Sequence, residues 1–174
     1  STLIRFPDVL SVCIPEIEPC IGFQQNNPHH NRDVWGHTIF AVSVAPKDIY
    51  TRLTLLYHDI GKPLCYSFEG GVGHFYGHAA ISRDIAEKSL RELRFDNQTI
   101  KSVTQLVEAH DRTIEPRKPV IRRCLNKMGM DQFLRLLDVK EADYAAQAQI
   151  YGDRLHKAEI LQMTDEIIAA QMQQ

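Results

Sequence analysis

Cysteine is scarce in this chain of 174 residues, and its four cysteines form no C-x-x-C pair. This scarcity excludes a disulfide-stapled scaffold and argues against a zinc–thiolate site, because both need closely spaced cysteines. We therefore expect free thiols, as in a reducing cytosol. An apolar run near the roughly 20 residues that a membrane span needs is also absent, which argues against a transmembrane protein.

An excess of charge of one sign is lacking as well. The formal net charge is −2, with 24% charged and 44% hydrophobic residues. This balance is typical of one soluble domain, and it argues against nucleic-acid binding over the whole surface, though not against a local basic patch. The N-terminus shows no basic start followed by an apolar stretch, so we expect no signal peptide, no membrane attachment and a cytoplasmic protein. The oligomeric state stays open.

What the chain does contain is helical periodicity, divided by caps, prolines and glycines. The expected helices are one short helix within 1–22 and then 34–44, 46–58, 78–93, 97–110, 119–127, 133–148 and 153–170, with Asp131 as a cap. Glycines inside residues 63–76 separate two β-forming runs and predict a small hairpin. We expect an all-α domain over 1–174, a compact array of about seven helices with this one hairpin.

The dipeptide His58-Asp59 ends the apolar run Leu53–Tyr57, and the stop signals Gly61 and Pro63 follow it. The run predicts a buried helix, so an imidazole and a carboxylate stand at its inner C-terminal end. A carboxylate is rarely buried unless it is paired or binds a metal. The dipeptide therefore needs partners from elsewhere in the chain.

Further histidines and aspartates stand near the ends of helices that must pack together. The candidates are His37, His58, Asp59, His78, His110, Asp111 and Asp143. Imidazoles and carboxylates without thiolates suit a divalent ion such as Fe, Mn, Co, Ni, Zn or Mg. Such ions polarise phosphoryl oxygens and activate water. Each residue also has a structural alternative, such as a hydrogen-bonded helix-end histidine or, for Asp143, a salt bridge with arginine.

The order of these residues resembles the HD superfamily of metal-dependent phosphohydrolases. His37 comes first, His58-Asp59 is followed by Gly61-Lys62, and Asp143 comes late in the chain. The resemblance implies that the first histidine, the doublet and the late aspartate bind one metal ion.

In dinuclear members of that superfamily two middle histidines complete a second site. By resemblance these are His78 and His110, with Asp59 bridging, so one or two ions are expected; in a mononuclear site the two histidines would be substrate or outer groups. His110-Asp111 is a second His-Asp dipeptide, but no Gly-Lys follows it, so it is not the name-giving motif.

Three longer motifs resemble the HD domain attached to bacterial CCA-adding enzymes and poly(A) polymerases. They are Pro28–Thr38, His58–Pro63 and Gly73–His78. In such relatives the HD domain follows a nucleotidyltransferase head, and some show metal-dependent phosphatase and 2′,3′-cyclic phosphodiesterase activity. The chain has no Gly-Ser pair and no Asp-x-Asp, so we do not expect polymerising chemistry in it. A stand-alone HD protein and a fragment of a longer protein both stay open.

The resemblance implies a hydrolase that acts on nucleotides or RNA 3′ ends, including those of tRNA. Lys62 would offset charge on the phosphate, and Asp59 would accept a proton from the nucleophile. For Lys62 the alternative is a favourable contact with the helix C-terminus. A non-catalytic RNA-positioning module and a phosphohydrolase of free nucleotides are the competing functions.

A basic stretch begins two residues after His110. It contains Arg112, Arg117, Lys118, Arg122, Arg123 and Lys127. This cluster of basic side chains predicts contacts with nucleotide or RNA phosphates. The alternative is a solvated basic face of a helix.

Overall fold

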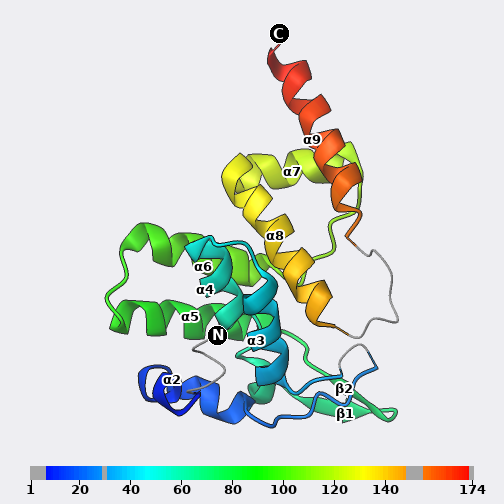
Figure 1. Ribbon diagram of the computed structural model, residues 1–174. Coiled ribbons are helices and arrows are strands. Elements are labelled where there is room, and N and C mark those ends of the chain that lie inside the picture. Colours follow the sequence, from blue (N-terminus) through cyan, green and yellow to red (C-terminus); the bar gives the residue numbers. More distant parts are fainter. Residues whose placement is uncertain (1–6, 29–30, 148–154, 173–174) are drawn as a thin grey trace.

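The computed structural model describes residues 7–28, 31–147 and 155–172. The α-helices in these ranges are α2 (Pro7–Cys13), α3 (Val34–Val44), α4 (Ile49–Tyr57), α5 (His78–Glu92), α6 (Asn97–Ala109), α7 (Lys118–Met128), α8 (Met130–Ala146) and α9 (Lys157–Met172) (Figure 1). Two short 3-10 helices are η1 (Pro15–Cys20) and η2 (Lys62–Leu64). The expected all-α array is confirmed.

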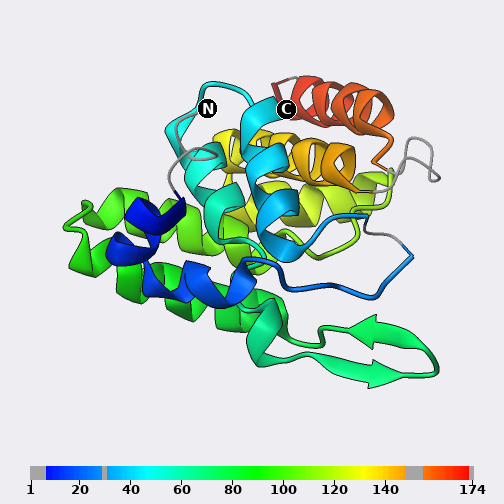
Figure 2. The ribbon, with the colours of Figure 1, turned by 60° about the horizontal axis from the view of Figure 1, so that its bottom comes forward.

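The expected hairpin is confirmed as well, and it is formed by β1 (Ser67–Glu69) and β2 (Val72–His74). The strands are antiparallel, with Ser67 opposite His74. Gly70 and Gly71 at the turn have φ angles of 59° and 83°, a region that glycine adopts without steric cost. The hairpin extends away from the helices beside the start of α5 (Figure 2).

Helix α4 lies at the centre of the fold, in contact with α3, α5, α6 and α8. α5 and α6 form an antiparallel pair on one side, while α7 packs against α8 and α9 on the other (Figure 1). One hydrophobic cluster surrounds Tyr57 and Leu90, and a second surrounds Phe133 and Leu137. A third cluster, which includes Leu55 and Val139, joins α3, α4 and α8.

Aspartate caps set where several helices begin. The carboxylates of Asp33, Asp48 and Asp96 accept hydrogen bonds from backbone N–H groups three residues later, at 2.9, 2.8 and 2.9 Å. Such caps satisfy donors that a helix start leaves unpaired. The cap at Asp48 corrects one expectation, since α4 begins at Ile49 and not at Pro46.

Two further helix starts differ from expectation. α8 begins at Met130, directly after Gly129, so Asp131 lies in its first turn and is not the cap. α9 begins at Lys157 rather than near 153, and residues 148–154 lie outside the described ranges. Within those ranges no helix combines the length and the apolar character needed to cross a membrane.

Candidate metal centre

The turn after α4 is packed tightly against the start of α5. A Cβ atom at Gly61 would lie 2.9 Å from the backbone nitrogen of Ser82 and 3.0 Å from the carbonyl oxygen of His78. The Gly61 N–H donates a hydrogen bond to the Ser82 hydroxyl at 3.0 Å. Glycine is needed at this position because a side chain would push the turn, and His58-Asp59 with it, away from α5.

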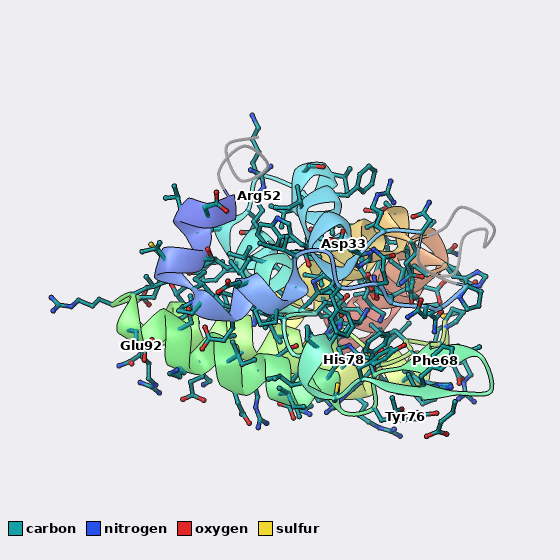
Figure 3. All side chains as sticks on the ribbon, turned by 90° about the horizontal axis from the view of Figure 1, so that it is seen from below. Asp33, Arg52, Phe68, Tyr76, His78 and Glu92 are labelled. Atoms are coloured by element: carbon teal, nitrogen blue, oxygen red, sulfur yellow. The ribbon has the colours of Figure 1, made fainter. Side chains whose placement is uncertain are left out.

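Six of the predicted ligands come together from five helices and the turn after α4. They are His37 in α3, His58 at the end of α4, Asp59 in the turn, His78 at the start of α5, His110 at the end of α6 and Asp143 in α8. All six side chains are buried. Figure 3 shows His78 where the hairpin joins α5.

His37, His58 and Asp143 form the first group. The Nε2 atom of His37 lies 2.9 Å from the Oδ1 atom of Asp143 and 3.2 Å from the Nε2 atom of His58. The His58 Nε2 atom lies 3.7 Å from the same Asp143 oxygen. Three possible ligand atoms therefore point at one small volume.

Asp59, His78 and His110 form the second group. The Oδ1 atom of Asp59 lies 3.4 Å from His78 Nε2 and 3.8 Å from His110 Nε2, and the two ring nitrogens are 3.2 Å apart. The other oxygen of Asp59 faces the first group, 3.2 Å from His58 Nε2 and 3.5 Å from His37 Nε2. Asp59 thus lies between the groups with one oxygen turned to each.

Backbone carbonyls hold all four imidazoles through Nδ1. The bonds run from His37 to Ala146 (3.3 Å), from His58 to Leu55 (2.7 Å), from His78 to Phe75 (2.9 Å) and from His110 to Val107 (2.6 Å). A carbonyl accepts only, so Nδ1 carries the proton, and in the neutral ring the lone pair of Nε2 faces the cluster. Histidines that bind metals are oriented in this way.

The cluster attracts positive charge. Burial would lower the pKa of His58, but the charges of Asp59 and Asp143 outweigh it and raise this pKa to about 10. Burial would raise the pKa of both carboxyls. His58 and Lys62 nevertheless hold the pKa of Asp59 well below its usual range. His37 and His58 do the same for the pKa of Asp143. Two ionised buried carboxylates beside four ring nitrogens fit a divalent cation.

The second group opens into a cavity of about 170 Å³, here called the metal cavity, which Asp143 also lines. Lys62 lines this cavity, although only 4% of its surface is exposed. Its Nζ atom lies 2.7 Å from the Oδ2 atom of Asp59 and donates a hydrogen bond to the Oε1 atom of Gln25 at 2.8 Å. Its ammonium group is therefore bound to the proposed bridging carboxylate. Asp111 lines the same cavity and is exposed.

Two residues of the centre carried little signal in the sequence. Lys140 is buried, and its Nζ atom donates to the carbonyl oxygen of His110 at 2.6 Å. Lys140 stands three residues before Asp143, on the same face of α8, and this spacing could have indicated that it lies near the centre. Gln25 holds Lys62 from an irregular loop, where no periodic pattern predicts which way a side chain points.

The basic stretch lies apart from the metal cavity. Arg117 forms an ion pair with Glu115, and Lys118 pairs with Glu166 at 2.6 Å. Arg122 and Arg123 are exposed on α7. Of the predicted phosphate contacts, Arg112 follows the metal-cavity residues most closely along the chain, but it does not line that cavity.

In this all-α domain, four histidines and two aspartates meet near helix ends, which places it in the class of helical domains that can hold a divalent metal. Within that class, the chain belongs to the HD domain family, which matches residues 31–148. This is a family of metal-dependent phosphohydrolases, whose domains bind divalent metals.

Two curated relatives are similar to this chain. It is 37% identical over 138 residues to a CC-adding tRNA nucleotidyltransferase of Thermus thermophilus, an alignment that covers 74% of this chain and 31% of the relative. It is 28% identical over 109 residues to an A-adding tRNA nucleotidyltransferase of Deinococcus radiodurans, covering 59% and 25%. The chain thus spans less than a third of either relative, and the expected resemblance to the HD domain of such proteins is confirmed.

Proposed function

We propose that this domain is a metal-dependent phosphohydrolase, a phosphomonoesterase or 2′,3′-cyclic phosphodiesterase that acts on nucleotides or RNA 3′ ends, including tRNA. The observation that carries the proposal is the convergence of four imidazoles and two carboxylates in two adjoining groups, the second of which opens into a cavity. Membership of the HD domain family supports it.

The residues divide into two ligand sets. His37, His58 and Asp143, with one oxygen of Asp59, would hold the first ion, and the other oxygen of Asp59 with His78 and His110 would hold a second. A divalent ion bound there supplies Lewis acidity toward a phosphoryl oxygen and lowers the pKa of water.

Asp59 and Lys62 act as a pair in this proposal. The low pKa of Asp59, which His58 and Lys62 maintain against the opposing effect of burial, makes the carboxylate a better ligand than proton acceptor. We therefore assign Asp59 the role of a ligand shared by the two metal sites ahead of the role of proton acceptor. Lys62 holds the Asp59 carboxylate in place and, from the cavity wall, adds a positive charge near a bound phosphate.

His58→Ala and Asp59→Ala test the proposal. We expect both variants to lose bound metal and to lower hydrolysis of 2′,3′-cyclic AMP by about a thousandfold or more, because each removes a ligand of the reacting centre. Elemental analysis gives the metal content, and circular dichroism checks the fold. Comparison with AMP and a dinucleoside polyphosphate identifies the preferred substrate.

His156→Ala is the matched control, because this exposed histidine precedes α9 and lies outside both ligand groups. It should keep full metal content and activity. Undiminished turnover by His58→Ala or Asp59→Ala would contradict the proposed site.

A non-catalytic RNA-positioning module is the second candidate, and the names of the two curated relatives favour it, since both are tRNA nucleotidyltransferases. In that case the ions would only join the helix ends. Metal-loaded protein without hydrolysis of any of these three substrates would support this candidate over the hydrolase.

A further inference from the structure

A second cavity, of about 230 Å³, lies on the other side of the turn that follows α6. Ala109 and Arg112 line this cavity, whereas His110 and Asp111 between them line the metal cavity. Neighbouring Cα atoms are only about 3.8 Å apart, so this turn is a wall shared by the two cavities. We call the second one the α7 cavity.

The α7 cavity is mostly apolar, although Gln105, Glu108 and Thr113 also line it. Its apolar lining consists of Ala109, Ile114, Val120, Met128 and Leu136 from α6, α7, α8 and the loop before α7. A volume of this size with hydrophobic walls takes a flat group such as one nucleobase rather than a hydrated ion. Cys124, a half-buried residue, also lines the cavity.

Cations surround this apolar volume. Arg112, Arg123 and Lys127 line the cavity, and the last two are one helical turn apart on α7. Burial raises the pKa of the Cys124 thiol, while the charges of Arg123, Arg112 and Lys127 act on it in the opposite direction. The three positive groups and the thiol line the same cavity.

These cations are weakly neutralised. No described residue forms an ion pair within 4 Å of Arg123 or Lys127, and Arg112 lies 3.8 Å from Glu108, which also pairs with Arg83 at 3.4 Å. Elsewhere in the basic stretch, acidic partners neutralise Arg117 and Lys118. Three of the six basic side chains of the stretch therefore lie at the α7 cavity with little neutralisation, while Arg122 is exposed outside it.

An apolar slot edged by cations matches a nucleobase flanked by phosphates. We propose that the α7 cavity binds one nucleotide of a single-stranded RNA whose 3′ end lies in the metal cavity. The placement of the 3′ end rests on the proposed function. The inference deepens that function, because it names an RNA strand and not a free nucleotide as the substrate class.

Protection of Cys124 from alkylation tests this inference without turnover. The probe is an RNA trinucleotide with a 3′-hydroxyl, which carries neither a terminal nor a cyclic phosphate for the proposed reaction. We expect it to slow iodoacetamide modification of Cys124 about tenfold at saturation and to leave the exposed Cys13 unchanged, as read by peptide mass spectrometry. Inorganic phosphate should not protect Cys124.

The variant Arg123→Gln/Lys127→Gln should weaken trinucleotide binding by roughly tenfold or more, measured by calorimetry. Arg122→Gln is the matched control, since this exposed arginine of α7 does not line the cavity. Equal weakening by Arg122→Gln, or equal protection of Cys124 by a polyglutamate peptide, would overturn the inference, because charge alone would then account for binding.

The outcomes separate this inference from the proposed hydrolase. Protection of Cys124 in a protein that hydrolyses no substrate supports the α7 cavity and contradicts the hydrolase. Hydrolysis without protection of Cys124 contradicts the α7 cavity alone.

Discussion

The two cavities on either side of the turn 109–112 are built by opposite means. At the metal centre, whose second ligand group opens into the metal cavity, the ligands come from five helices and the turn after α4, and backbone carbonyls anchor every imidazole. In the α7 cavity, the charged groups are the long side chains of Arg112, Arg123 and Lys127, which are exposed and have few partners. The first arrangement holds its groups rigidly, and the second lets them move.

This difference matches two kinds of task. Metal-assisted chemistry needs ligand atoms held in place before the ion arrives, because misplaced ligands lower both affinity and rate. Binding of a flexible strand needs positive charge and apolar surface, which tolerate small displacements of the ligand. Changes to the metal cavity should therefore alter stability and rate together, whereas changes to the α7 cavity should alter binding alone.

Metal removal should have the largest effect on stability. At a free metal concentration 100 times its Kd, bound metal should stabilise the folded domain by about 2.7 kcal/mol. Removing the metal should therefore lower Tm by roughly 5–10 °C. Differential scanning calorimetry with and without a chelator measures the shift. Arg123→Gln/Lys127→Gln should show the full shift in Tm, and His58→Ala should show almost none. A reduced shift in the double variant would contradict the expectation that the α7 cavity has no part in metal binding.

Gly61→Ala should come next, at a cost of about 1–3 kcal/mol, because the new Cβ would meet backbone atoms of α5. Urea unfolding gives the loss, and Gly61→Val should cost more than Gly61→Ala. The same substitution should weaken metal binding, since it displaces Asp59. An unchanged unfolding midpoint would show that the turn is not held as tightly as the structure indicates.

Lys140→Met should have the smallest effect, a roughly tenfold loss of kcat and of metal affinity with little change in Tm. Lys140 is a positioning residue that holds the backbone carbonyl of His110 at the end of α6. Methionine fills a similar volume, so the buried charge is removed without leaving a large cavity. Lys101→Met, at an exposed lysine of α6, is the control. A fall in Tm without a fall in metal affinity would mean that Lys140 has only a structural role.

Local signals were sufficient for most of the fold. Aspartate caps, glycine stops and helical periodicity predicted the helices and the hairpin, because these depend on neighbours within a few residues. Two of the three misplaced starts, those of α4 and α8, arose where a cap or a glycine competed with a nearby proline or aspartate. The roles proposed for the site residues remain predictions that the experiments above test.

The amino-acid sequence by itself determined the set of chemical groups, their order along the chain and the helix ends that carry them. His37, His58-Asp59 and Asp143 could be named from motif and order alone. Only the tertiary structure decided which atoms face one another, that Asp59 turns one oxygen to each histidine group, and that Lys62 binds this carboxylate. It also decided which basic residues of 112–127 share a cavity. The reason is physical, since helix packing brings together groups more than 100 positions apart, at distances that no local pattern encodes.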